Sequence, residues 1–548
     1  MKKITLLLGL LLGLGWNALA GDRICLITDR PAYIAGDLVY CSAFAIDEKG
    51  RNSDFSAVAY VELISTEGTL TEAKIGLFNG RGAGAFRIPA NAPTGNYRLV
   101  AYTARGEADP SGSSLLSIYN TASTARVAGG VEIVPEAAWK APERAESAPV
   151  GGLRLSFPGR LRSGRSATLL VEGPEEAADL VVSVYHEDGL PAGNPLSLSN
   201  FLQKSTPGGK GPRAGEYEGE IIYASVEGLD ASSGSDNPEH VTAFLSTAGA
   251  LSNVYVGRPA GDGQLLFYTG NIYGDHELVC EVVSMSGSTC HISLRSPFLH
   301  PEPGDIPVLP LSKALRSDLV NRKAALRADT EHPQDTLVTF LPKREDLLLE
   351  GIPFLRYHLD DYNRFPTVRE ICTEFIPELT FSRIKGQWRL RMNVTDATES
   401  RHFLQDNILV MMDGVVLTDH SLLADFDALL LEDIDIYRQA VAIGQLSFNG
   451  VVNFISKKNY VTALQFPENT RVVDFKGVSY PVAYLGEVPS GEDLRQLLFW
   501  HPALDLPAGS QLRIPIQAPA YAGRFRIVVQ GKRADGSPLH AEYTFEVE

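Results

Sequence analysis

The sequence predicts a mainly β protein, built as a row of β-sandwiches with one small α/β domain among them. Most of the chain consists of short runs rich in β-branched and aromatic residues, separated by Gly, Pro and Asn turns. The chain contains 50 Gly and 33 Pro, as many turns require. Residues 349–461 instead mix helical and strand patterns. A length of 548 residues allows several domains.

The composition fits packed globular domains and argues against a nucleic-acid partner. Hydrophobic residues make up 44% of the chain, which is ordinary for proteins with a core. The formal charge is −17, and no stretch dense in Lys and Arg interrupts it. Binding to nucleic acid needs such a basic surface, so we exclude this class of function.

Residues 1–20 read as a secretory signal peptide. Lys2 and Lys3 provide the positive start, Ile4 to Trp16 the apolar run, and Ala18-Leu-Ala20 a small-residue cleavage site. The run is short for a membrane anchor, the alternative interpretation, and no later segment reaches 18 apolar residues. We therefore expect an exported protein, periplasmic or associated with the outer membrane, with no membrane span of its own.

Export to an oxidising compartment makes cysteine pairing a consideration. Cys280 and Cys290 flank a predicted hairpin turn, and Cys25 and Cys41 lie on consecutive predicted strands. Both pairs are candidate disulfides on this geometry. Cys372 is left over and is expected to be a small buried residue of a helix.

Residues 21–135 are expected to form the first sandwich. Short strand-like runs are separated by turn residues at Arg23–Thr28, 37–47, Ala57–Ser65, 84–88 and 96–104. The stretches Thr28 to Tyr40 and Phe86 to Tyr97 resemble a macroglobulin-like domain of the alpha-2-macroglobulin family. The resemblance implies an immunoglobulin-like sandwich. In the second stretch Pro93 fixes φ and Gly95 permits the positive φ of a turn.

An internal repeat suggests further copies of this module. The segment Arg87 to Val100 recurs as Arg513 to Val528 with two extra residues. Strand patterns at 167–172, 180–185, 221–226, 241–245, 265–268 and 278–283 lie between the two copies. We therefore expect β-sandwiches at 150–204, 215–298 and 465–548.

Residues 299–348 are expected to be a Pro-rich linker followed by a helix. The helical spacing extends over Lys313–Arg327. In the next region, Phe365 to Pro377 reads as a short helix capped by Thr367. A strand is predicted after it at Trp388–Val394.

The stretch Asn407 to Asn459 carries the most distinctive motifs. A strand ends at Asp413-Gly414, Leu431 to Tyr437 forms another, and Asn449-Gly450 leads into a last strand. This order resembles the plug domain of TonB-dependent receptors, and the resemblance covers 349–461. No series of lipid-facing strands follows. The resemblance implies a plug that works with another protein's barrel, and it makes Asp413, Gly414, Asn449 and Gly450 the hypothetical partner-binding residues.

The sequence lacks the common catalytic and cofactor motifs, so we expect a protein that is not an enzyme. The Cys-Gly-Glu-Gln thioester of protease-trapping macroglobulins is missing, so thioester-mediated trapping of proteases is not expected. No nucleophile elbow, zinc helix or Walker loop occurs. The acidic pairs at 360–361 and 432–435 fit a helix start and the wet face of a strand better than calcium binding or glycoside hydrolysis. We expect no catalytic residues, cofactor or metal.

The order of domains resembles exported proteins of Bacteroidetes-type bacteria that join macroglobulin-like modules to a plug-like domain without a barrel. The leading expectation is a non-catalytic interaction protein whose plug-like domain docks on an outer-membrane barrel or a transport or secretion component. The alternatives are a periplasmic or surface module that binds glycans or peptides, for example by strand addition, and a cryptic hydrolase.

Overall fold

A computed structural model of the protein describes residues 22–47, 49–106, 113–142, 144–173, 177–193, 196–203, 215–228, 241–249, 252–260, 264–284, 289–331, 337–338, 352–395, 402–458, 461, 464–533 and 535–548. The expected signal peptide lies outside these residues. The chain folds as two compact units, each assembled from segments that are separated in the sequence. The first unit comprises Met1–Gly219, Phe298–Pro342 and Val478–Glu548, and the second Glu220–Pro297 and Lys343–Gly477.

The predicted fold class is confirmed, since the chain is mainly β with many sheets. No helix within the described ranges is long and apolar enough to cross a bilayer.

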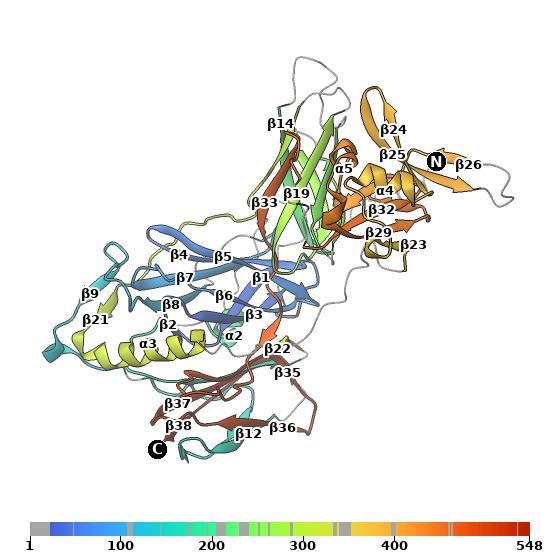
Figure 1. The fold of residues 1–548 in the computed structure, drawn as a ribbon. Coiled ribbons are helices and arrows are strands. Elements are labelled where there is room, and N and C mark those ends of the chain that lie inside the picture. The colour runs from blue at the N-terminus through green and yellow to red at the C-terminus, as the bar shows by residue number, and fades with distance from the viewer. Residues whose placement is uncertain are drawn as a thin grey trace, which may run out of the picture. The chain divides into compact units, whose positions relative to one another are not determined.

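The first sandwich contains eight strands in the order β1-β3-β6-β5-β4-β7-β8-β2 (Figure 1). Their bounds are β1 Arg23–Thr28, β2 Ala32–Ile34, β3 Leu38–Ile46, β4 Val58–Ser65, β5 Gly68–Phe78, β6 Arg81–Arg87, β7 Gly95–Tyr102 and β8 Ser114–Tyr119. The five predicted strands are present, whereas β2, β5 and β8 were not predicted. Much of β5 is only partly buried and carries polar residues. Its sequence therefore lacks the hydrophobic alternation by which strands are predicted.

The second sandwich joins two segments that the sequence separates. Its sheets are β10-β12-β36 and β11-β38-β37-β13-β35. The bounds are β10 Arg154–Ser156, β11 Arg160–Leu161, β12 Ser166–Glu172, β13 Ala177–His186, β35 Leu497–Leu506, β36 Gln511–Gln517, β37 Gly523–Arg533 and β38 Pro538–Val547. Strand β13 lies between β35 and β37. The separate sandwiches expected at 150–204 and 465–548 are therefore one domain, because neither segment alone supplies both layers.

The sequence repeat has the same structural role in both copies. Its first copy runs from the end of β6 into β7, and its second from β36 into β37. In neither copy do the two strands pair with each other. In the second sandwich the connection passes from one sheet to the other. The repeat thus marks a connection between strands that do not pair, rather than a hairpin.

The Pro-rich segment after residue 298 is fixed to the first sandwich. Asn96 Nδ2 donates to Pro307 O at 2.8 Å, and Arg98 Nε donates to Pro303 O at 2.8 Å. Strand β21 (Leu309–Leu311) then pairs with β9 (Val131–Ile133). The predicted helix is confirmed as α3 (Arg316–Glu331), which lies beside β2 and β8 (Figure 1).

The sandwich of the second unit also recruits a strand from far along the chain. Its sheets are β17-β18-β14-β20 and β16-β15-β19-β33. The bounds are β14 Glu220–Glu227, β15 Val241–Thr247, β16 Val254–Val256, β17 Arg258–Pro259, β18 Gln264–Gly270, β19 Asp275–Ser284, β20 His291–Leu294 and β33 Thr470–Lys476. Strand β33 falls within the expected 465–548 domain, yet it pairs with β19 from Asp275 to Glu281.

An α/β domain lies in the sequence between β20 and β33. Its main sheet has the order β23-β29-β32-β27-β28, in which β27 is parallel to β32. The bounds are β23 Leu355–His358, α4 Val368–Glu374, β24 Leu379–Ile384, β25 Gln387–Thr395, β26 His402–Gln405, β27 Leu409–Met412, β28 Val415–Val416, α5 Ser421–Ala424, β29 Leu431–Tyr437 and β32 Val451–Ser456. Thr367 caps α4 as predicted, in a capping box with Glu370.

The cysteines do not form the expected disulfides. Cys25 lies opposite Phe44 and Cys41 opposite Thr28, so the two are three steps apart on the β1–β3 ladder. Three steps span about 10 Å, beyond the roughly 4.4–6.8 Å that a disulfide allows between Cα atoms. Their side chains also enter different cores. Cys280 and Cys290 share one core but are not bonded.

Candidate functional site

Asp413 and Gly414 form the tight turn between β27 and β28. Both have a positive φ, 48° at Asp413 and 80° at Gly414, which explains a glycine and an aspartate at these positions. A Cβ at Gly414 would lie only 2.0 Å from Ser252 Oγ. The turn is therefore packed against the segment around Ser252 in the same unit.

The Asp413 carboxylate accepts hydrogen bonds from groups inside the domain. It accepts hydrogen bonds from Ser456 N and Ser456 Oγ, both at 2.7 Å, and from Val461 N at 3.2 Å. The Gly414 amide donates to Asn453 Oδ1 at 3.1 Å. Asp413 is only 7% exposed. The turn thus orders the sheet, and the hypothesis that it presents a partner-binding surface is not supported by its burial.

Asn449 and Gly450 differ in exposure. Gly450 is buried, and a Cβ there would approach Tyr437 O to 2.8 Å, so only glycine fits. Its carbonyl accepts from Leu409 N at 2.9 Å and starts the β27–β32 pairing. Asn449 is exposed. Of the four hypothetical partner residues, Asn449 alone presents its side chain to solvent.

A basic hairpin projects from the same domain. Strands β24 and β25 are joined by a two-residue turn at Lys385 and Gly386, which have φ of 50° and 89°. Residues 379–395 contain four basic side chains and no acidic one, in a chain with a net charge of −17. We call the residues Arg383, Lys385, Trp388 and Arg389 the hairpin tip. Its three basic residues are exposed.

Trp388 gives the hairpin tip an aromatic centre. The guanidinium carbons of Arg369 and Arg383 lie 4.9 and 5.8 Å from its ring centroid. The Trp388 amide donates to Ser421 Oγ at 3.2 Å, which ties β25 to α5. The tip therefore combines cationic groups and a flat ring on a backbone that is held in place. The run of basic residues without acids at 379–395 is the sequence signal of this surface.

His420 anchors the base of this hairpin. Its buried Nδ1 accepts from Leu390 N at 2.9 Å, so the neutral ring carries its proton on Nε2. Burial, together with the Arg389 charge, lowers the pKa of His420 to about 4. The ring stays neutral at physiological pH and acts as a structural acceptor.

Several acidic groups of the α/β domain are paired with basic side chains. Asp435 accepts from Arg356 Nε and Nη2, both at 2.6 Å, in a bidentate pair. Asp433 lies 2.7 Å from His358 Nδ1, and Asp360 contacts Arg364. Asp360 and Asp361 lie in the 3-10 turn Leu359–Asp361, ahead of α4 rather than at its start. Asp435 is buried, however, rather than on the wet face that the alternation with Ile434 predicted.

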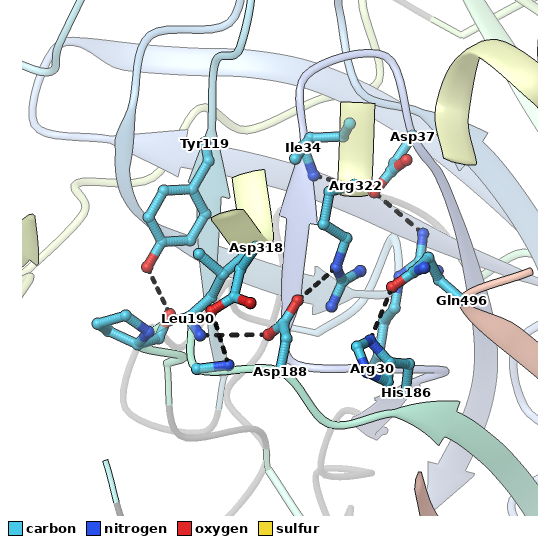
Figure 2. A network of polar contacts seen from close by, with 12 residues as sticks. Arg30, Ile34, Asp37, Tyr119, His186, Asp188, Leu190, Asp318, Arg322 and Gln496 are labelled. Carbon is cyan, nitrogen blue, oxygen red and sulfur yellow. Dashed lines mark hydrogen bonds and ion pairs between the residues drawn. The ribbon is translucent and has the colours of Figure 1, made fainter. Parts of the chain in front are cut away.

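The first unit contains a second concentration of charge, this one buried (Figure 2). Arg322 of α3 points to Asp188 at the end of β13, with Nε 2.6 Å from Oδ2. Both side chains are 4% exposed. Burial opposes the charge on Asp188, but the Arg322 guanidinium holds its pKa below the usual value. Asp318, one turn earlier on α3, accepts from Gly189 N at 3.2 Å.

The buried network continues to the first and second sandwiches. Arg30 Nη2 lies 3.0 Å from Asp37 Oδ2, and Asp37 also accepts from Ile34 N at 2.9 Å. His186 Nδ1 contacts Gln496 Oε1 at 3.0 Å (Figure 2). Burial lowers the pKa of His186. Each of these groups is fixed by partners on other elements, as in a network that specifies how elements pack.

A cavity of about 760 Å³ lies next to this network, within the first unit. It is lined by residues of β1, β8, β13, β35, β37 and β38 and of neighbouring loops, including Asp29, Arg144, Trp500, Arg526 and His540. Within the described part of the chain, Trp500 Nε1, Arg526 Nε and His540 Nδ1 are buried polar atoms without a hydrogen-bond partner. Burial raises the pKa of Asp29 to about 6, against the opposing Arg30 charge. The cavity is polar enough to hold water or a small polar ligand.

Comparisons with known proteins add little beyond the class of fold. No protein-family model matches the chain, and no curated protein matches it. Among solved structures, Salmonella alpha-2-macroglobulin reacted with methylamine is 11% identical, over 96% of this chain and 24% of that one, with a TM-score of 0.16.

Two further structures are similar at the same level. Escherichia coli alpha-2-macroglobulin activated by porcine elastase is 9% identical, over 96% of this chain and 53% of that one, with a TM-score of 0.16. An ICAM-5 D1–D4 ectodomain fragment is 12% identical over 54% of each chain, with a TM-score of 0.11. The chain spans only part of these structures. With TM-scores this low, the matches carry no conclusion about arrangement or function.

Proposed function

We propose that the chain is a non-catalytic, exported interaction protein whose α/β domain docks on a partner through the hairpin tip. The single observation that carries this proposal is the exposed set of Arg383, Lys385 and Arg389 around Trp388, in an otherwise acidic chain. Aromatic and arginine side chains are enriched at protein interfaces. Opposite charge on a partner would steer association and set its orientation.

The class of partner is proposed from the resemblance of this domain to a receptor plug. The order of elements supports it: β27 ends in the Asp413-Gly414 turn, β29 follows, and Asn449-Gly450 leads into β32. The partner would be an outer-membrane barrel or a transport or secretion component with an acidic surface. The sandwiches, proposed as macroglobulin-like modules, would serve as spacers and further contact surfaces.

The absence of catalysis is part of the proposal. The titratable groups that lie close together are engaged with one another: Asp188 with Arg322, Asp435 with Arg356, and Glu542 with Arg526 and His540. A general base needs a free lone pair beside a substrate. These carboxylates are better suited to holding elements together.

Co-purification tests the docking proposal. We expect the tagged chain to retain a barrel or secretion protein after gentle extraction of outer membranes. The triple variant R383E/K385E/R389E should lose that partner. The control R154E/R162E/R165E makes the same charge change on exposed residues of the second sandwich and should keep it. A chain recovered only as a free monomer, or equal capture by both variants, contradicts the proposal.

A second candidate function is a binding module for peptides or glycans, and the cavity beside Trp500 favours it. Its lining offers indole and guanidinium N–H donors and an imidazole nitrogen to a polar ligand. Peptide panels and glycan arrays would detect such a ligand. Ala145 lines the cavity and is exposed, so A145W should block binding, whereas A122W at an exposed site off the cavity should not. Binding that A145W leaves intact would contradict this assignment.

A further inference from the structure

Two glutamates face each other across a strand pair in the first sandwich. Glu62 of β4 is the direct partner of Glu72 of β5 in the antiparallel ladder. Like charges directly opposite one another destabilise a sheet unless a cation lies between them. Glu62 is also fully buried, which raises the cost of an uncompensated charge. A positive group between the two carboxylates would offset this cost.

His300 brings an imidazole nitrogen to both carboxylates. Its Nδ1 lies 3.2 Å from Glu62 Oε2 and 3.5 Å from Glu72 Oε1. The hydroxyl of Thr69 lies 3.0 Å from Glu62 Oε2 and 3.3 Å from His300 Nδ1. Ligands about 2.0–2.2 Å from a tetrahedral zinc ion are separated by roughly 3.4 Å. The two distances from His300 Nδ1 thus match edges of a tetrahedral coordination shell, and the three ligand atoms of Glu62, Glu72 and His300 all lie within 4.8 Å of one another.

The Glu62 carboxylate is oriented by groups outside this cluster. Its Oε1 accepts from Leu299 N at 3.1 Å, from His300 N at 3.0 Å and from the Tyr102 hydroxyl. Oε2 is thereby directed to the cluster. Outer hydrogen bonds of this kind fix the ligands of metal sites and tune their affinity. The same contacts place the His300 ring, because its own amide is one of the donors.

Exposure leaves the cluster open on one side. The Glu62 side chain is 0% exposed, Glu72 is 29% exposed and His300 is 54% exposed. A cation could enter from solvent and keep one or more water ligands on the open side. Three protein ligands with an open position are common for zinc.

We infer that Glu62, Glu72 and His300 form a site for one divalent transition-metal ion of the Zn²⁺ type, a site outside the proposed docking surface. One imidazole nitrogen and two carboxylate oxygens suit zinc better than magnesium or calcium, which prefer oxygen ligands alone. The bound ion neutralises the Glu62–Glu72 pair. It also ties the segment around His300 to strands β4 and β5.

Zinc titration of the full chain tests the site. After removal of metals with a chelator, calorimetry and elemental analysis should find one tight Zn²⁺ per chain at neutral pH. H300A and E72Q should abolish it, and each keeps the backbone contacts of the site. Y102F, which removes one donor to Glu62, should weaken binding about tenfold. Circular dichroism checks that each variant is folded.

A matched control is available in the second unit. His291 Nε2 lies 2.9 Å from Glu227 Oε2, and among the residues that the structure describes no second acid joins this pair in a metal-binding cluster. H291A should bind Zn²⁺ as the unaltered chain does. Co²⁺ in place of zinc should give the intense visible absorption of low-coordinate cobalt, lost in H300A.

Two results would overturn the assignment. The first is the absence of stoichiometric Zn²⁺ in the folded, unaltered chain. The second is zinc binding that H300A and E72Q do not change, which would place the ion elsewhere.

Discussion

The buried network of the first unit and the hairpin tip of the second unit use charge in opposite ways. Arg322 and Asp188 are each 4% exposed and each is held by a fixed partner. Arg383, Lys385 and Arg389 are exposed, and the segment that carries them contains no acid. Buried charges must be paired, so they select one packing of the elements that carry them. Exposed charges cost little and remain available to another molecule.

The largest effect on stability is expected at the buried pair of Arg322 and Asp188. Arg322→Met leaves Asp188 buried without its cation, so we expect a loss of about 3–5 kcal/mol in the free energy of unfolding of the first unit. The double variant R322M/D188L should recover much of this loss. Denaturant unfolding followed by fluorescence measures both.

A control lies on the same helix. Arg327 pairs with Glu331 one turn further along α3, and both side chains are exposed. R327M should leave the unfolding midpoint unchanged. Equal shifts of the unfolding midpoint in R322M and R327M would show that burial does not determine how much an ion pair contributes to stability.

Acid should selectively weaken the α/β domain. The pKa of His420 is lowered from 6.5 to about 4 in the folded state, mainly by burial. The unfolded state therefore binds the proton more readily. The contribution of neutral His420 to the free energy of unfolding is fully present above pH 6.5. This contribution, up to about 3 kcal/mol, is lost as the pH falls toward 4. Unfolding curves of the chain between pH 7 and 4, followed at Trp388, measure this loss.

His420→Gln sharpens this test. Its amide oxygen can still accept from the Leu390 amide, but the side chain does not titrate. The variant should lose most of the acid sensitivity at Trp388. An unchanged pH profile would assign the sensitivity to another group.

The Asp413 turn should behave as a buried structural charge rather than as a contact surface. Asp413→Ala removes the acceptor for Ser456 and Val461 and puts alanine at a positive φ, so we expect a loss of about 2 kcal/mol. Asn449→Ala, at the exposed turn, should have a much smaller effect. Thermal unfolding of the two variants gives the comparison, and equal shifts would contradict it.

The smallest effect on stability is expected at the hairpin tip. R383E/R389E changes exposed charges, so the free energy of unfolding should change by less than about 0.5 kcal/mol. Partner capture should nevertheless fall. A variant that unfolds readily would show instead that these arginines hold the hairpin, for example through the Arg383 contact with the Trp388 ring.

Local features were predicted well from the sequence. The strand Arg23–Thr28 has the expected bounds, and the capping box of Thr367 and Glu370 confirms the start of α4. The turn at Asp413-Gly414 was expected as a turn, but its burial was not. The ion-pair partners of the buried Asp188 and Asp435 could not be predicted either, because Arg322 and Arg356 are remote in the sequence from the acids they contact.

The sequence by itself determined the mainly β class, many of the longer strands, the helices α3 and α4 and the turn chemistry, because these depend on periodicity and on residues a few positions apart. Only the tertiary structure decided that β13 lies between β35 and β37, that β33 completes the sheet of β19, and that Glu62 faces Glu72 beside His300. Such pairings join segments that are distant along the chain, and many alternative partners fit the same hydrophobic pattern. Register and burial in the folded chain select among them.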